Sequence, residues 1–393
     1  MQPLRFATAG SVDDGKSTLI GRLLYDARAI QEDQLAAVER ASQRRGVAGI
    51  DLSLLTDGLE AEREQGITID VAYRYFATPR RKFIIADSPG HEQYTRNMAT
   101  GASNADALVL LVDVRKGLLP QTRRHLEIAR LLGIRQVVVF VNKMDLGGYS
   151  EQAFRAVAQD EALAGALLIP GSALHGDMIV ERGERLPWYV GPTLIEQLER
   201  LDAGTETAAG GPFRFPVQLV SRPPADGPQQ GLRGYMGRVE SGHALTAADV
   251  VVLPGGKRTR IRRILCHGSE RQIAVAGDSV TLALADDIDL SRGDLIAGAA
   301  QAPHEASQLD VTLVWLGHEP LHPGGRYLVQ QASRRVLARV SADAPVKLND
   351  VATARLTLQA PLFVDPYATV RATGSLILID EATNQTVAAA LVR

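Results

Sequence analysis

The chain has 393 residues, which is too long for one ordinary hydrophobic core, so we expect two or three domains. Its hydrophobic content of 45% and charged content of 22% are typical of a globular protein, and the net charge of -2 excludes a chain that is basic throughout. The single cysteine, Cys266, excludes a disulfide framework. The sequence shows neither a signal peptide nor a membrane-spanning apolar run, so we expect a cytoplasmic protein.

From residue 1 to about residue 200, short apolar runs alternate with helical patterns. The runs are LRFATAG, KFIIAD, ALVLLVDV and QVVVFVNK. Continuous apolar runs of this length are typical of strands in a parallel sheet that is buried on both faces. Apolar residues between them recur at helical spacing, as at Leu19, Ile20 and Leu23. The pattern predicts a doubly wound, mostly parallel α/β domain over residues 1–203.

The character of the sequence changes after LDAGTETAAGGP, a Gly-rich segment that begins at Leu201 and is typical of a linker. The apolar runs that follow are divided by Gly, Pro and Asp, and no long helical pattern appears among them. They are FRFPVQLV, RGYMGRVE, DVVVLPGG, DSVTLALA, QLDVTLVWL, RYLVQQA, RRVLARV and TARLTL. This pattern predicts two antiparallel β-barrel domains, which we place at residues 212–300 and 304–393.

The first motif that carries chemistry is GSVDDGKS, which has the form G-x-x-x-x-G-K-S and lies between a strand and a helix. Its glycines let the backbone N–H groups face phosphate oxygens, and the helix adds the positive end of its dipole. We expect Lys16 to reach the β- and γ-phosphates and Ser17 to bind Mg²⁺. By itself this P-loop does not specify the base. The predicted phosphate-binding residues are Gly10, Ser11, Val12, Asp13, Asp14, Gly15, Lys16, Ser17 and Thr18.

The second motif is DSPGH, at the end of the run KFIIAD. A carboxylate at the end of a buried strand is unfavourable unless it has a partner. Mg²⁺, held directly or through water, would be such a partner for Asp87. The alternative for Asp87 is a helix N-cap. Gly90 can bring its backbone N–H to a γ-phosphate, a contact that can hold a switch loop in one state. The predicted nucleotide-binding residues here are Asp87, Ser88, Pro89, Gly90 and His91.

The third motif, VNKMD, specifies the base. Asp145 can accept hydrogen bonds from N1–H and the exocyclic amine of guanine, whereas adenine would place a bare acceptor against the carboxylate. We expect Asn142 to brace the loops and the stem of Lys143 to lie against the base. In GSALHG, Ser172 and the backbone of Ala173 can meet the guanine O6 edge. The predicted base-binding residues are Asn142, Lys143, Met144, Asp145, Ser172, Ala173 and Leu174.

A switch that senses the γ-phosphate completes the predicted catalytic site. Thr68, in EREQGITID, lies between the P-loop and Asp87, and its hydroxyl is expected to bind Mg²⁺ in the triphosphate state. The predicted metal ligands are therefore Ser17, Thr68 and Asp87. The charged residues from Glu60 to Glu64 are interpreted as a solvated helix face. The predicted catalytic residues are Lys16, Thr68, Gly90 and His91, of which His91 would orient the attacking water.

A GTPase domain followed by two barrels resembles the translation-factor class of GTPases, whose best-known member is elongation factor Tu. The strings that carry this resemblance are REQGITID, DSPGHEQY, LPQTRRH, VNKMD and GRVESG. Longer strings closely resemble a narrower family, the large, GTP-hydrolysing subunit of bacterial sulfate adenylyltransferase (ATP sulfurylase). They are GSVDDGKSTLIGRLLYD, DGLEAEREQGITIDVAYRYF, KFIIADSPGHEQYTRNMATGAS and DIDLSRGDL. The sequence departs from this family at Ser88, where the family usually has Thr.

The resemblance implies a GTP- and Mg²⁺-dependent subunit that works as a heterodimer with a separate small catalytic subunit. The small subunit would bind ATP and sulfate and join them into adenosine 5′-phosphosulfate and pyrophosphate. GTP hydrolysis would drive this reaction forward in sulfate assimilation and cysteine synthesis. No nucleic acid or membrane partner is implied. Some relatives carry a fused adenylylsulfate kinase, but the sequence has no second P-loop, so we expect no kinase activity.

Three other hypotheses stay open at this point. A ribosome-associated translation factor of the elongation factor Tu type would bind aminoacyl-tRNA. A non-catalytic scaffold, whose nucleotide only regulates assembly, would keep its partner's activity after the substitution His91→Ala. A P-loop kinase has no need of the guanine-binding carboxylate that VNKMD supplies, so the motif disfavours it.

Overall fold

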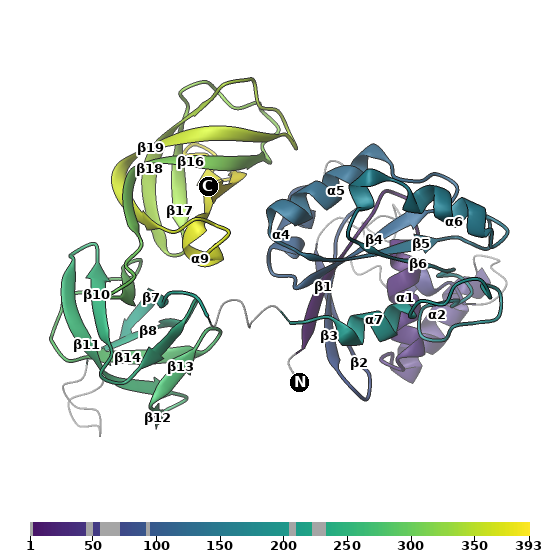
Figure 1. Ribbon diagram of the computed structural model, residues 1–393, viewed down its shortest axis with the longest axis horizontal. Coiled ribbons are helices and arrows are strands. Elements are labelled where there is room, and N and C mark those ends of the chain that lie inside the picture. The colour runs from purple at the N-terminus through teal and green to yellow at the C-terminus, as the bar shows by residue number, and fades with distance from the viewer. Residues whose placement is uncertain (1–2, 45–49, 56–70, 92–94, 204–209, 222–232) are drawn as a thin grey trace. The chain divides into compact units, whose positions relative to one another are not determined.

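A computed structural model describes residues 3–44, 50–55, 71–91, 95–203, 210–221 and 233–393. The chain divides into two compact units, Met1–Ala203 and Gly204–Arg393, and each is described by itself (Figure 1). The segment 60–64 and residues 204–209 of the predicted linker lie outside the described residues. None of the helices in the described part of the chain combines the length and apolar character needed to cross a membrane.

The first unit is built on a six-stranded sheet with the order β2-β3-β1-β4-β5-β6. Every pairing is parallel except that of β2 with β3. The four apolar runs form β1, β3, β4 and β5, so the predicted doubly wound, mostly parallel sheet is confirmed. The strands are β1 (Leu4–Ala9), β2 (Ala72–Ala77), β3 (Lys82–Asp87), β4 (Ala107–Asp113), β5 (Gln136–Asn142) and β6 (Leu167–Pro170).

Helices cover both faces of this sheet, with α4, α5 and α6 on one face and α1 and α7 on the other (Figure 1). Local signals start several of them: Pro120 occupies the first turn of α5, Ser150 caps α6, and Thr193 forms a capping box with Glu196 at α7. The helices are α1 (Lys16–Asp26), α2 (Glu32–Arg44), α4 (Thr95–Ser103), α5 (Pro120–Leu131), α6 (Glu151–Ala158) and α7 (Leu194–Arg200). Two short 3-10 helices span Leu52–Leu55 and Glu161–Leu163.

The sheet order places one edge of the sheet at a topological switch point. The strand β1 lies between β3 and β4 and is parallel to both, so the connections that leave these strands diverge. Ligands of open α/β sheets bind outside the carboxyl ends of the strands at such a point. The segment after β1 is the P-loop, and the segments after β3, β5 and β6 carry the other predicted motifs.

The second unit contains two antiparallel barrels, as predicted. In the first, six strands follow the order β10-β15-β7-β8-β14-β11, and β11 pairs with β10 to close the ring. Cys266 faces its apolar core. The ring strands are β7 (Arg214–Ser221), β8 (Gly234–Arg238), β10 (Asp249–Leu253), β11 (Lys257–Cys266), β14 (Ser279–Leu284) and β15 (Leu295–Gly298). Three short strands accompany them: β9 (His243–Leu245), β12 (Ser269–Arg271) and β13 (Ile273–Val275).

The second barrel is closed in the order β16-β19-β18-β17-β20-β21. Alternate residues of its strands fill the interior, where Trp315 is the largest fully buried side chain. Its strands are β16 (His304–Trp315), β17 (Arg326–Gln331), β18 (Arg334–Ala342), β19 (Val351–Val364), β20 (Ser375–Ile379) and β21 (Thr386–Val392). One helical turn, α9 (Arg371–Gly374), precedes β20.

A buried ion pair joins the two barrels. Arg214 of β7 donates from Nε and Nη2 to the two carboxylate oxygens of Asp365, both at 2.8 Å, and only 1% of the Arg214 side chain is exposed. Its Nη1 donates to the carbonyl groups of Phe213 and Gln301, and Thr373 donates to Asp365. Burial acts to raise the pKa of Asp365, but hydrogen bonds from Arg214 and Thr373 keep it below its ordinary value.

We predict that Arg214→Met lowers the free energy of unfolding of the barrel unit by about 3–5 kcal/mol, because it leaves a buried carboxylate without its guanidinium partner. Arg260→Met is the control, because Arg260 and Asp249 are 68% and 72% exposed. The control should cost at most about 0.5 kcal/mol. Urea unfolding followed by Trp315 fluorescence, in a Trp188→Phe background, measures both losses. Equal losses in the two variants would contradict the prediction.

Candidate functional site

The P-loop connects β1 to α1 through a glycine that no other residue could replace without strain. Gly15 has a φ of 92° and forms the N-cap of α1. A Cβ atom at this position would lie 2.4 Å from Nδ2 of Asn142. The backbone can therefore approach the end of β5 closely only because position 15 has no side chain.

Lys16 is buried inside the curl of the P-loop and is 8% exposed. Its Nζ donates to the carbonyl oxygens of Gly10 and Ser11, both at 3.0 Å. Burial lowers the pKa of Lys16, while the carboxylates of Asp87 and Asp14 act to raise it. The ammonium group is therefore held at the position where a P-loop receives phosphate groups.

Asp14 is a second buried charge in the same loop. Its Oδ2 accepts the backbone N–H of Ser11 at 2.7 Å, and the residue is 2% exposed. Burial raises the pKa of Asp14 to about 6, against the opposing effects of the Ser11 hydrogen bond and of Lys16. The loop thus holds a buried carboxylate in addition to the buried ammonium group.

The segment after β3 packs directly on the P-loop. Asp87 is 1% exposed, lies beside Thr8 in the β1–β3 register, and accepts a hydrogen bond from its hydroxyl at 3.3 Å. A Cβ atom on Gly90 would lie 2.3 Å from Nζ of Lys16 and 3.0 Å from the carbonyl oxygen of Gly10. A buried carboxylate at this strand end, with the Ser17 hydroxyl in the first turn of α1, is a donor set that fits Mg²⁺.

The side-chain amide of Asn142, at the end of β5, links two loops. Its Nδ2 donates to the carbonyl oxygen of Asp14 at 2.8 Å, and its Oδ1 accepts the backbone N–H of Ala173 at 2.9 Å. The sequence predicts that the Ala173 backbone meets the O6 edge of guanine. Because its N–H donates to Asn142 in the structure, that contact stays a prediction.

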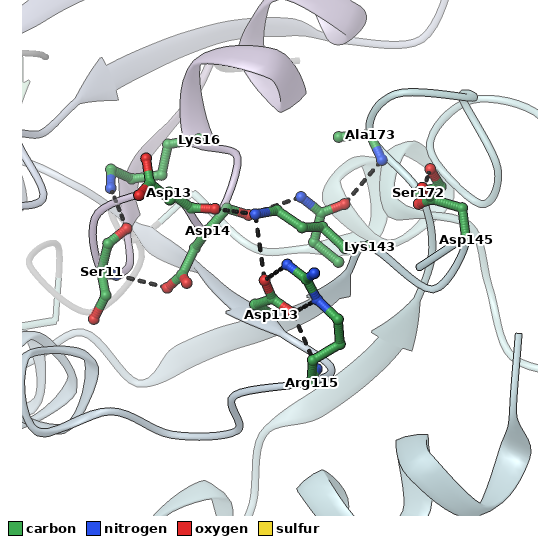
Figure 2. A network of polar contacts seen from close by, with 11 residues as sticks. Ser11, Asp13, Asp14, Lys16, Asp113, Arg115, Lys143, Asp145, Ser172 and Ala173 are labelled. Atoms are coloured by element: carbon green, nitrogen blue, oxygen red, sulfur yellow. Dashed lines mark hydrogen bonds and ion pairs between the residues drawn. The ribbon is translucent and has the colours of Figure 1, made fainter. Parts of the chain in front are cut away.

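A cluster of charged side chains holds Lys143, the residue after Asn142 in the VNKMD motif (Figure 2). Lys143 has a φ of 61°, and its Nζ donates to the carbonyl oxygen of Asp13 and lies 3.3 Å from Oδ2 of Asp113. Arg115 donates to the same carboxylate from Nε at 3.0 Å and from Nη2 at 2.7 Å. Burial acts to raise the pKa of Asp113, but the hydrogen bonds from Arg115 and Lys143 hold it at about 2.

The predicted base-binding carboxylate is already oriented. Ser172 donates its hydroxyl to Oδ1 of Asp145 at 2.6 Å, and the backbone N–H of Met144 donates to the carbonyl group of Gly171 at 3.1 Å. Arg22 of α1 donates to the carbonyl oxygen of Leu174 at 2.6 Å. The segment after β6 is thus fixed both to the end of β5 and to the helix that follows the P-loop.

The structure brings together the predicted residues of the segments 10–18, 87–91, 142–145 and 172–174. They lie at strand ends, in the connecting loops and in the first turn of α1. His91 is half-buried and directly follows Gly90. Ser88 is fully buried, and its Oγ has no hydrogen-bond partner in the described part of the chain. Thr68 lies outside the described residues, so its predicted role is not tested.

Sequence reasoning missed Asp113, Arg115 and Arg22. Asp113 ends a buried apolar run, and this is the same signal that identified Asp87. Arg115 lies two residues later, and its positive charge is the counter-charge that a buried Asp113 needs. Arg22 contacts a segment about 150 residues away, and its sequence position carries no such signal.

Three features define a P-loop GTPase. They are a P-loop at the switch point of a doubly wound sheet, an Asp at the end of β3, and an Asn-Lys-x-Asp motif at the end of β5. Comparisons with known proteins agree. Residues 2–207 match the family model described as "Elongation factor Tu GTP binding domain". Residues 308–393 match the model "GTP-eEF1A C-terminal domain-like".

Two relatives match along almost the whole chain. The chain is 49% identical to "Sulfate adenylyltransferase subunit 1" of Laribacter hongkongensis (strain HLHK9), covering 99% of this chain and 85% of the relative. It is 47% identical to "Bifunctional enzyme NodQ" of Rhizobium sp. (strain N33), covering 99% of this chain and 63% of the relative. Among solved structures, bacterial selenocysteine-specific elongation factor EF-Sec matches with a TM-score of 0.47 and 25% identity, over 100% of this chain and 58% of that one.

The chain therefore belongs to the GTPases with an elongation factor Tu GTP-binding domain and, among them, to the sulfate adenylyltransferase subunit 1 family. The resemblance found in the sequence is confirmed at this level. The chain spans less than two thirds of the length of NodQ. The region of NodQ that this chain matches is thus only part of that longer protein.

We predict that Gly90→Ala weakens binding of a GTP analogue about tenfold, which corresponds to about 1.4 kcal/mol. The added methyl group would overlap Nζ of Lys16 and crowd the carbonyl oxygen of Gly10, so both must shift. Gly255→Ala is the matched control, because a Cβ atom there meets open space. Titration with a fluorescent GTP analogue measures both affinities. The same affinity in the two variants would show that the close packing at Gly90 does not matter.

Proposed function

We propose that this chain is the GTP-hydrolysing subunit of a sulfate adenylyltransferase. GTP hydrolysis on it drives the synthesis of adenosine 5′-phosphosulfate and pyrophosphate from ATP and sulfate, which a separate small subunit carries out. The observation that carries the proposal is the 49% identity to a sulfate adenylyltransferase subunit 1 over 99% of the chain. With this role we propose a cytoplasmic heterodimer that serves sulfate assimilation and cysteine biosynthesis, and the domain limits 1–203, 212–300 and 304–393.

In the proposed site, the P-loop residues 10–18 hold the phosphate groups. Lys16 exchanges its contacts with the carbonyl groups of Gly10 and Ser11 for the β- and γ-phosphates, which are better partners for a buried ammonium group. The oxygens of Ser17, Thr68 and Asp87 would hold Mg²⁺, which would neutralise charge on the phosphates.

For the hydrolytic step, we assign His91 the role of orienting the attacking water. Gly90, the residue before His91, supplies a backbone N–H to the γ-phosphate. The position of Gly90 beside Lys16 supports this role. The chemistry is largely positioning and electrostatic stabilisation, as in other phosphoryl transfers. Loss of the γ-phosphate removes the contact at Gly90 and releases the segment 87–91.

Coupling to the partner requires that the partner bind the GTP and GDP states with different affinity, because a ligand shifts an equilibrium only by its differential affinity. The segments that change with the γ-phosphate, around Thr68 and from Asp87 to His91, are therefore the proposed elements that the small subunit reads. The small subunit, and not this chain, binds ATP and sulfate in this proposal.

We predict that Asp145→Asn weakens GTP about 100-fold and improves binding of xanthosine triphosphate, because each hydrogen bond to a charged group contributes about 1.5–3 kcal/mol. The amide can donate to the 2-oxo group of xanthine, which replaces the amine of guanine. Competition against a fluorescent nucleotide gives both affinities, and retained binding of xanthosine triphosphate proves that the variant is folded. Unchanged GTP affinity would refute the role of Asp145.

We also predict that Lys16→Ala abolishes GTP-dependent synthesis of adenosine 5′-phosphosulfate in the reconstituted two-subunit complex. Synthesis without GTP should stay at the wild-type level, because ATP and sulfate bind to the other subunit. Lys257→Ala, at an exposed lysine of β11, is the matched control. Circular dichroism checks that the fold is retained. Equal GTP stimulation in wild type and in Lys16→Ala would overturn the role of the P-loop in coupling.

A further inference from the structure

The string LPQTRRH, which contributed to the family resemblance, has no role in the site described so far. It opens α5, and two of its residues lie beside nucleotide-responsive segments. The hydroxyl group of Thr122 lies 2.8 Å from the hydroxyl group of Ser11 in the P-loop. Thr122 is fully buried and Ser11 is 5% exposed, so water does not compete for this hydrogen bond.

The preceding residue, Gln121, reaches the start of α4. Its Nε2 donates to Oγ1 of Thr95 at 3.3 Å and lies 2.9 Å from Nε2 of His125. Its Oε1 accepts from Arg124 at 3.2 Å, which fixes the orientation of the amide. Since the amide nitrogen is only a donor, Nε2 of His125 is the acceptor and its ring carries the proton on Nδ1.

His125 is a neutral, buried support for Gln121. It is 0% exposed, and burial, together with the charges of Lys16 and Arg124, lowers its pKa to about 3. Its Nδ1 has no hydrogen-bond partner in the described part of the chain. A buried donor without a partner is unfavourable for folding, so stability alone does not explain a histidine at this position.

We propose that Thr122 positions the P-loop for GTP binding and that Gln121 is a positioning residue for GTP hydrolysis, with His125 orienting Gln121. Thr122 holds the P-loop through Ser11. Gln121 holds Thr95, the first residue of α4, which follows His91 by four positions. One turn of α5 thereby sets the distance between the phosphate-binding loop and the segment that carries the water-orienting histidine. The inference rests on the proposed role of His91.

The two links have different consequences. Loss of the Thr122 contact loosens the P-loop in every nucleotide state, so it weakens binding. Loss of the Gln121 contact leaves the P-loop in place but weakens the hold on Thr95 at the start of α4, four residues after His91, so it slows hydrolysis of bound GTP. A small misplacement of a group that orients a reactant can cost orders of magnitude in rate.

The test measures single-turnover hydrolysis of GTP bound to the full chain, and the dissociation constant of GTP, without any partner. Gln121→Met should lower the hydrolysis rate constant about tenfold while the dissociation constant changes less than about twofold. Thr122→Val should raise the dissociation constant about fivefold, and Thr122→Ser should restore it, because serine keeps the hydroxyl group. Gln152→Met, at an exposed glutamine of α6, is the matched control and should match wild type.

A double-mutant cycle separates positioning from general damage. Thr95→Val should lower the rate constant as much as Gln121→Met, and the double variant should be no slower than either single variant. Wild-type rates in Gln121→Met, or a double variant slowed by the product of the two effects, would overturn the proposal. Failure of the sulfate assignment would not affect these rates, whereas failure of the GTPase assignment would appear as no hydrolysis by wild type.

Discussion

The side-chain amide of Asn142 joins the two halves of the nucleotide site. It donates to the P-loop at Asp14 and accepts from the loop after β6 at Ala173, so neither loop can move away from the other without breaking a buried hydrogen bond. The contact depends on the glycine at position 15, where any Cβ atom would overlap the amide. Parallel strand ends bring these loops to one edge of the sheet, and Asn142 then fixes their separation.

The electrostatics of the site suit an anionic ligand with a divalent cation. The buried ammonium group of Lys16 donates to the carbonyl oxygens of Gly10 and Ser11. Phosphate oxygens are stronger partners for it. The carboxylate of Asp113 is neutralised by Arg115 and Lys143, so it does not repel phosphate. The carboxylate of Asp87 has a different environment, with a hydroxyl donor from Thr8, and is suited to a metal ion.

The sequence predicted the elements whose signal is local. Four buried strands form continuous apolar runs. In the edge strand β2, by contrast, exposed residues alternate with partly or fully buried ones, and β6 has only four residues. The barrel strands β9, β12 and β13 have three residues each, too short for a periodic pattern. Motifs identified the residues that are proposed to face the nucleotide. Arg22 and Gln121 make their contacts only in the folded chain, so no spacing in the sequence indicates them.

In the proposed function, this chain hydrolyses GTP in service of sulfate activation. The most direct measurement compares its GTP hydrolysis rate alone with the rate in the presence of the small adenylyltransferase subunit, ATP and sulfate. We expect a large rise, with adenosine 5′-phosphosulfate formed alongside phosphate. A rate that the small subunit and its substrates leave unchanged would contradict the sulfate assignment while leaving a GTPase, and ribosomes would then be the partner to add.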